Sequence, residues 1–143
     1  MTPKQYLSRA RGIDRRIGAM LEERAQLWAL ATKMSSPLTG MPHGGSGADP
    51  LAHSVERIIL LEHDIDDMIG SFVDTRDEIT AAIAQVEDGR YRLLLHCRYI
   101  LGLSWEDIGN RMNYDLRWVH RLHGHALLAV QSILDKRAVM NTP

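Results

Sequence analysis

Two stretches of this 143-residue chain carry apolar residues at alternating steps of three and four, and this spacing narrows the possible folds more than any other feature. The first stretch covers residues 5–34, interrupted only by Arg24, and the second covers residues 51–87, interrupted by Thr75. Such steps keep side chains on one face of an α-helix, as in helices that pack along a partner helix. The two seams consist of Tyr6, Ala10, Ile13, Ile17, Met20, Leu27, Ala31 and Met34, and of Ile58, Leu61, Ile65, Met68, Phe72, Ile79, Ala82 and Val86.

The segment between the seams, residues 35–50, is predicted to form a loop. It is rich in residues that end helices, namely Pro37, Gly40, Pro42, Gly44, Gly45, Gly47 and Pro50. At 1.5 Å per residue, each flanking helix would be roughly 45–55 Å long. Two helices of similar length joined by a loop predict an antiparallel hairpin of coiled-coil type over residues 1–87.

Further apolar residues lie beside both seams, and two helices alone cannot cover so wide an apolar stripe. Either self-association or packing against the C-terminal helices of the same chain would cover it. We expect a homodimer, because a two-helix hairpin has too small a core to be stable alone. The flanking residues are Leu21, Trp28 and Leu30 in the first stretch, and Val55, Ile59, Ile69, Val73 and Ile83 in the second.

The remainder of the chain is predicted to form three shorter helices, followed by a disordered tail at residues 138–143. Asp88 and Gly89 end the second long helix, and Gly102 ends the helix after it. Strand-forming residues are sparse, so the predicted fold class is all-α, with the long hairpin followed by a three-helix domain at residues 88–137. Its helices are expected at residues 90–101, 104–112 and 115–137.

Residues 105–122 have the pattern of a helix-turn-helix. Ser104 and Asp107 resemble a capping box at the start of the first helix, and Asp115 can cap the second. Gly109 is small enough for the second helix to approach closely, and Asn113 tolerates the left-handed conformation that the turn needs. The crossing would be filled by Ile108, Met112, Tyr114, Val119 and Leu122. An ordinary helical hairpin with a coincidental apolar pattern is the alternative.

The last helix is expected to face inward at Val119, Leu122 and Ala126, which leaves Arg117 and Arg121 facing outward. These arginines are four residues apart near the helix start, the part that enters the major groove in this type of motif. An arginine can donate two hydrogen bonds to guanine, which is worth roughly 1–3 kcal/mol of discrimination. Two solvated surface arginines are the alternative interpretation.

Four more side chains are candidates for DNA contact. His120 and His125 could bind a base edge or a phosphate, and an imidazole gains charge near pH ~6.5. Trp118 could contact DNA sugars or wedge between the helices, and Arg111 is placed to contact the DNA backbone. The predicted recognition helix is 115–125, and the predicted DNA-binding residues are Arg111, Arg117, Trp118, His120, Arg121 and His125.

The net charge of -1 conceals a segregation of charge along the chain. Residues 1–34 hold seven basic and three acidic side chains, residues 49–89 hold two and eleven, and residues 90–143 hold eight and four. The basic C-terminal segment suits contact with DNA phosphates. The acidic segment would be repelled by DNA and is expected to face a basic partner such as the N-terminal helix, unless it is simply a solvated face.

Several other functions have no support in the residues. Cys97 cannot form an intramolecular disulfide and is expected to be a buried thiol. A structural zinc site usually includes several thiolates, so the histidines at 120, 123 and 125 do not predict a metal site. No nucleophile, base and oxyanion donor can be combined, so we expect neither an enzyme nor a cofactor. No apolar run approaches the ~20 residues that span a bilayer, so a cytoplasmic protein without a membrane partner is expected.

Residues 90–127 resemble region four of bacterial sigma factors, in which an R-Y-L-x-G-L-S/T-x-x-E/D-I-A segment leads into a recognition helix; the sequence here is RYRLLLHCRYILGLSWEDIGNRMNYDLRWVHRLHGHAL. Nearly the whole chain resembles the ArpU/RinA-like late-transcription regulators of phages and prophages. The matching elements are RGIDRRI, GMPHGG, RYRLLL and RWVHRLHG. This resemblance implies a protein that binds DNA and acts on phage gene transcription in the bacterial host. Sigma-type recognition helices often carry additional Lys or Arg, whereas this one carries His120, His123 and His125.

Our hypothesis from the sequence is a helical, dimeric DNA-binding transcription regulator whose partner is double-stranded DNA. One alternative is a protein-interaction module that binds host RNA polymerase or another regulator. The other is a DNA-packaging subunit, because small-terminase subunits also combine a helix-turn-helix with long oligomerising helices. A dimer would favour the regulator, and a ring would favour the packaging subunit.

Overall fold

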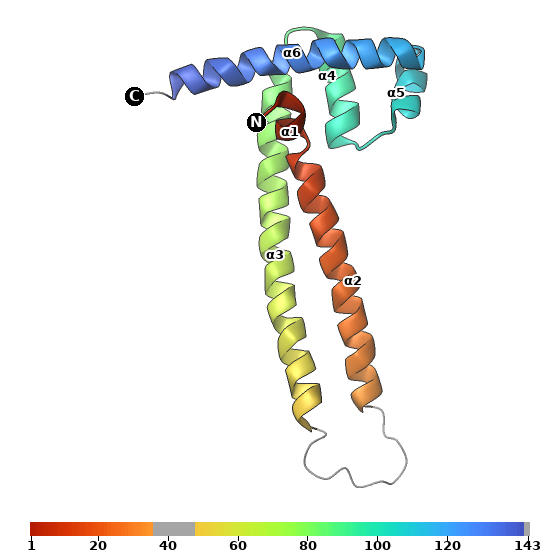
Figure 1. Ribbon diagram of the computed structural model, residues 1–143, viewed down its shortest axis with the longest axis vertical. Helices are drawn as coiled ribbons and strands as arrows, with labels where there is room; N and C mark the ends of the chain where they lie inside the picture. Colours follow the sequence, from red (N-terminus) through yellow and green to blue (C-terminus); the bar gives the residue numbers. More distant parts are fainter. Residues whose placement is uncertain (36–47, 142–143) are drawn as a thin grey trace. The chain divides into compact units, whose positions relative to one another are not determined.

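The computed structural model describes residues 1–35 and 48–141, and these residues form helices without any strand (Figure 1). The predicted all-α class is therefore confirmed. The elements are α1 (Pro3–Leu7), α2 (Arg9–Ser35), α3 (Ala48–Ala84), α4 (Gly89–Leu95), the π-helical segment η1 (His96–Ile100), α5 (Trp105–Met112) and α6 (Leu116–Met140). Most of the predicted Gly/Pro-rich loop and the side chain of Met34 lie outside the described part of the chain, and none of the described helices could cross a membrane.

The helix boundaries differ from the predictions at several points. The first predicted helix is divided at Ser8 into α1 and α2, and α1 starts with a capping box between Thr2 and Gln5. The second begins at Ala48, with Pro50 in its first turn, where its missing N–H removes no helical hydrogen bond. The last extends to Met140, so the predicted tail is helical at residues 138–140, and residues 142–143 lie outside the described part.

The chain divides into two compact units, residues 13–71 and residues 1–12 with 72–143. We call them the middle unit and the terminal unit. The terminal unit is larger than the predicted three-helix segment, because it also contains α1 and the last turns of α3.

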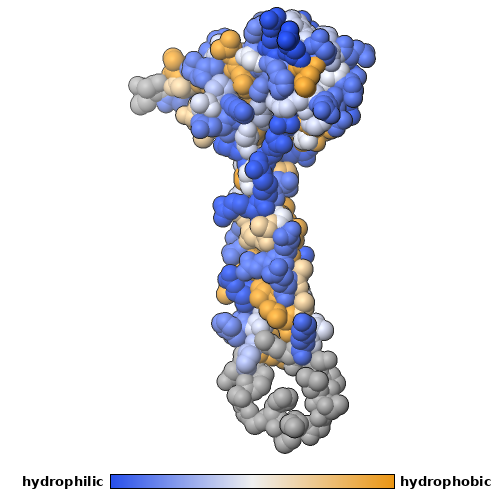
Figure 2. Space-filling model, turned by 45° about the vertical axis from the view of Figure 1, so that its right-hand side comes forward, coloured by the Kyte–Doolittle hydropathy of each residue, from blue (hydrophilic) through white to orange (hydrophobic). Residues whose placement is uncertain are grey.

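In the middle unit, α2 and α3 run side by side in opposite directions (Figure 1). The described seam residues of both helices are buried or partly buried, and Arg57 forms an ion pair with Glu23 at 3.3 Å. Most residues that flank the seams are exposed, and Figure 2 shows apolar surface among polar surface along these helices. The fully or almost fully buried residues are Ile17, Ala31, Ile58, Leu61 and Ile65.

The terminal unit contains a larger core, to which every one of its elements contributes. Within it, α1 packs against α6, and Tyr6 of α1 donates a hydrogen bond of 3.0 Å to Glu78 of α3. Arg9 forms an ion pair with the same carboxylate at 3.2 Å. Burial alone would raise the pKa of Glu78, but the hydrogen bonds from Arg9 and Tyr6 outweigh it and lower that pKa. The most deeply buried side chains are Leu7, Ile79, Leu94, Leu95, Ile108, Val119, Leu122 and Val130, and Cys97 is the buried thiol that the sequence predicts.

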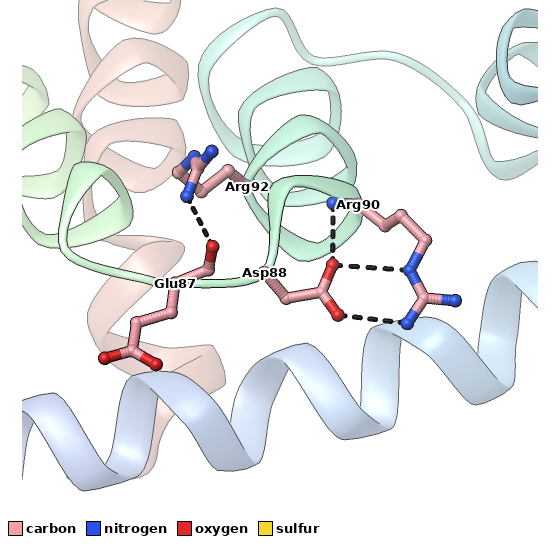
Figure 3. Close-up of polar contacts among 4 residues, drawn as sticks. All are labelled: Glu87, Asp88, Arg90 and Arg92. Atoms are coloured by element: carbon pink, nitrogen blue, oxygen red, sulfur yellow. Dashed lines mark hydrogen bonds and ion pairs between the residues drawn. The ribbon is translucent and has the colours of Figure 1, made fainter.

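Two arginines fix the turn between α3 and α4 (Figure 3). Asp88 caps α4 by accepting a hydrogen bond of 2.9 Å from the backbone N–H of Arg90, and its carboxylate also binds the Arg90 guanidinium at 3.0 Å. Arg92 donates to the carbonyl oxygen of Glu87 at 2.8 Å. It also donates to the carbonyl oxygen of Val86, which is not drawn there, at 2.6 Å. The side chains of Arg90 and Arg92 therefore both bind groups of this turn.

The crossing of α5 and α6 depends on the absence of a side chain at Gly109. A Cβ built there would lie 2.8 Å from the backbone oxygen of Tyr114 and 3.5 Å from a methyl carbon of Val119. The first of these distances is shorter than real contacts, and a backbone atom cannot move aside without moving the turn. The sequence prediction that Gly109 permits a close approach is confirmed.

We expect Gly109→Ala to lower the free energy of unfolding by about 1–3 kcal/mol, the usual cost of overpacking. Gly124→Ala is the matched control, because Gly124 lies within α6 and a Cβ there would have no neighbour within 4 Å. Alanine is preferred over glycine in a helix by roughly 0.5–1 kcal/mol, so this variant should be more stable than the wild type. Urea denaturation of both variants tests the difference, and a Gly109→Ala protein as stable as the control would contradict the tight crossing.

Candidate nucleic-acid interface

The segment from α5 to α6 has N-caps at Ser104 and Asp115 and the turn that the sequence predicts, although of the predicted capping box only the half in which Ser104 accepts is present among the described contacts. The Ser104 hydroxyl accepts a hydrogen bond from the backbone N–H of Asp107 at 3.1 Å, and the Asp115 carboxylate accepts one from that of Trp118 at 2.8 Å. Asn113 has φ 59° and ψ 42°, the left-handed conformation, and it is the sole non-glycine residue with positive φ in the described part of the chain. The left-handed Asn113 and the cap at Asp115 together therefore fix the direction in which α6 leaves the turn.

The first half of α6 divides into a buried face and an exposed face. Val119, Leu122 and Ala126 are at most 1% exposed, whereas Arg117 and Arg121 are exposed. This distribution confirms the predicted orientation. His125 continues the row of Arg117 and Arg121 one turn later, and His120 lies beside this row; both imidazoles are exposed.

The arginines on this surface are not engaged by acidic residues. Among residues 1–35 and 48–141, the ion pairs are Arg9–Glu78, Arg57–Glu23 and Arg90–Asp88, and none involves Arg111, Arg117 or Arg121. Arg111 is exposed in the last turn of α5, apart from the row on α6. These three guanidinium groups are available to bind an anion.

Trp118 has a different position from the other predicted contact residues. Its side chain is half-buried, packs against the core of the terminal unit and meets the Tyr114 ring edge-on, with 6.3 Å between the ring centroids. This placement matches the wedge between helices that was one of the two interpretations of Trp118.

A buried aromatic cluster behind the exposed face was not predicted. The Tyr99 hydroxyl and His123 Nε2 share a hydrogen bond of 2.7 Å, and the Trp105 ring meets His123 edge-on at 4.5 Å between centroids. Trp105 also contacts the His120 ring at 5.0 Å, and the Arg98 guanidinium lies over its face at 4.3 Å. The burial of His123 could have been predicted from the sequence, because His123 is four residues after Val119 and so lies on the inward face of the helix.

The environment of His123 favours the neutral imidazole. Burial is the largest cause of the shift, and Lys4, Arg98 and His120 add to it, so that the pKa of His123 falls to about 4. His123 therefore acts as an uncharged hydrogen-bonding partner of Tyr99. Within the described residues, no three His, Cys, Asp or Glu side chains are grouped so that they could hold a metal ion.

Comparisons of the chain with protein-family models, with curated proteins and with solved structures gave no match.

We expect the chain to lose stability as the pH falls from about 6.5 towards 4, because the unfolded chain takes up a proton on His123 before the folded chain does. Between pH 7.5 and 5 the contribution of this histidine should amount to roughly 2 kcal/mol. Urea denaturation at several pH values measures it. His123→Asn should reduce this pH dependence, whereas His125→Asn, which alters an exposed histidine, should retain it. If the free energy of unfolding depends on pH equally in the wild type and in both variants, His123 is not buried as a neutral group.

Proposed function

We propose that this chain is a sequence-specific duplex-DNA-binding transcription regulator of phage genes, with α5 and α6 acting as a helix-turn-helix. The observation that carries the proposal is the exposed row of Arg117, Arg121 and His125 on α6, which begins in the first turn after the Asp115 cap and contains no described ion pair.

The supporting geometry concerns how α6 could meet DNA. The B-DNA major groove is about 12 Å wide and admits one α-helix. The exposed row lies opposite to Val119, Leu122 and Ala126, so the core of the terminal unit holds α6 from behind while its polar face stays open. Within a groove, Arg117 and Arg121 would reach base edges, and Arg111 would reach a phosphate of the backbone.

We expect Arg117→Ala and Arg121→Ala each to cost roughly 1–3 kcal/mol of binding on a specific duplex and to relax the preference at one base pair. Arg111→Ala should instead weaken binding to all duplexes about equally and reduce the slope of log affinity against log salt by roughly 1. The specific duplex is obtained by selection from a random library with the full chain, and affinities are measured by titration at two salt concentrations.

Lys136→Ala is the matched control for these three variants, because Lys136 is exposed on α6 far from the proposed reading surface. It should leave sequence preference unchanged. If the full chain selects no sequence and binds no duplex in low salt, the proposed function is wrong. If both arginine variants keep the full preference, α6 does not read bases in the way proposed.

We further propose that the chain acts as a homodimer, which would suit recognition of two half-sites of DNA. The support comes from exposed apolar residues on one side of the middle unit. In an antiparallel pair of helices, residues that directly follow the seam on either helix share one side. The large apolar residues at these positions of the middle unit are 38–50% exposed, namely Leu21, Trp28, Val55, Ile59 and Ile69.

We expect the wild-type chain to sediment as a dimer and the double variant Leu21→Gln/Trp28→Gln to sediment as a monomer. Leu30 and Leu60 provide a matched control, since they are 48% and 58% exposed but lie at positions on the opposite side of the seams. Leu30→Gln/Leu60→Gln should remain dimeric. A monomeric wild type at high concentration would exclude the dimer, and a ring-sized species would favour the packaging subunit instead.

A further inference from the structure

Four basic side chains that belong to different parts of the sequence meet on the terminal unit. Lys4 lies in α1, Arg11 in the first turn of α2, Arg98 in η1 and His120 in α6. The packing of α1 against α6 brings the N-terminal segment to this side. Arg98 and His120 are linked by the Trp105 ring, which contacts both of them at 4.3 and 5.0 Å.

These side chains are close enough to affect the same titrating groups. Lys4, Arg98 and His120 all lower the pKa of His123, in addition to its burial. Arg11 lowers the pKa of Arg98, although burial is the larger cause there too. None of the four takes part in an ion pair within the described ranges of the chain. The fold thus brings basic side chains together without a carboxylate that pairs with them. A bound anion would offset the repulsion between these basic groups.

The donors in this group are exposed or partly exposed to solvent. Arg98 uses one nitrogen to donate to the carbonyl oxygen of Leu103 at 3.0 Å, and its other N–H groups form no hydrogen bond with a described residue. Lys4 and His120 are exposed, and Arg11 is partly exposed. His120 is three residues after Arg117 and therefore adjoins the row proposed to read bases. The charged surface is continuous with the first half of α6.

We propose that Lys4, Arg11, Arg98 and His120 bind phosphates of the DNA strand that borders the groove entered by α6, so that the N-terminus of the chain is part of its DNA-binding surface. This inference rests on the proposed function. An extended polyanion suits the arrangement better than a small anion, because the basic groups are spread over several elements at an open surface. Each such contact releases counterions from the duplex and so steepens the salt dependence of binding.

The test compares two double variants of the full chain that remove equal charge. Lys4→Gln/Arg11→Gln alters the proposed surface, whereas Arg15→Gln/Arg16→Gln removes two exposed arginines of α2 within the middle unit. Affinity is measured by titration on the selected duplex and on a scrambled duplex at several salt concentrations. The first variant should bind both duplexes several-fold more weakly, with the slope of log affinity against log salt reduced by roughly 2. The second should match the wild type.

A charge-preserving variant, Lys4→Arg/Arg11→Lys, guards against an effect on folding alone, and it should keep the wild-type slope. The inference is overturned if Lys4→Gln/Arg11→Gln binds with the wild-type slope while the wild type still selects its sequence. It is also overturned if both Gln variants lose the same affinity, which would indicate a nonspecific effect of net charge. A wild type that binds no duplex would instead refute the proposed function, and this inference with it.

Discussion

The contact between Gly109 and the backbone oxygen of Tyr114 is the constraint on which the rest of the candidate interface depends. With only hydrogen at Gly109, the turn after α5 folds directly against α5, and Asn113 supplies the left-handed residue that reverses the chain. Asp115 then caps α6, and the start of the helix at this cap determines which of its side chains face the core. The side of α6 on which Arg117 and Arg121 lie therefore depends on a residue that precedes them by eight and twelve positions. Any residue with a Cβ at this position would rotate or displace α6 and the row of arginines with it.

The basic residues divide into those that hold the fold together and those that remain unengaged. Arg9, Arg57, Arg90 and Arg92 bind carboxylates or backbone carbonyl oxygens, and Arg137 donates to the Tyr6 hydroxyl at 3.3 Å. The formal positive charge of the C-terminal segment is thus larger than the number of basic side chains that are free to bind an anion. Among the unengaged cations, Arg111, Arg117 and Arg121 lie at the end of α5 and at the start of α6, and Lys4 and Arg11 lie in α1 and the first turn of α2. It is this placement, more than the total charge, that supports contact with a polyanion.

Features that arise from neighbours in sequence were predictable, and those that arise from distant contacts were not. Burial along both seams follows from helical spacing, and the caps at Ser104 and Asp115 follow from local hydrogen bonding. The division at Ser8 was missed, as was the packing of α1 against α6, because nothing in residues 1–12 indicates a partner more than a hundred residues away. The π-helical segment was missed for a related reason. Its hydrogen bond from Leu101 to His96 accompanies the placement of Tyr99 and Arg98 against side chains of α5 and α6.

The composition of the terminal unit from both ends of the chain has a consequence for the order in which the protein can fold during synthesis. Tyr6 and Leu7 are synthesised well before the α6 residues against which α1 packs, and the hydrogen bond from Arg137 to Tyr6 spans 131 positions. Contacts this distant in sequence form slowly, whereas α2 and α3 need only one loop to close before they pair. The middle unit can thus fold while the apolar side chains of α1 are still uncovered, before α6 has left the ribosomal exit tunnel.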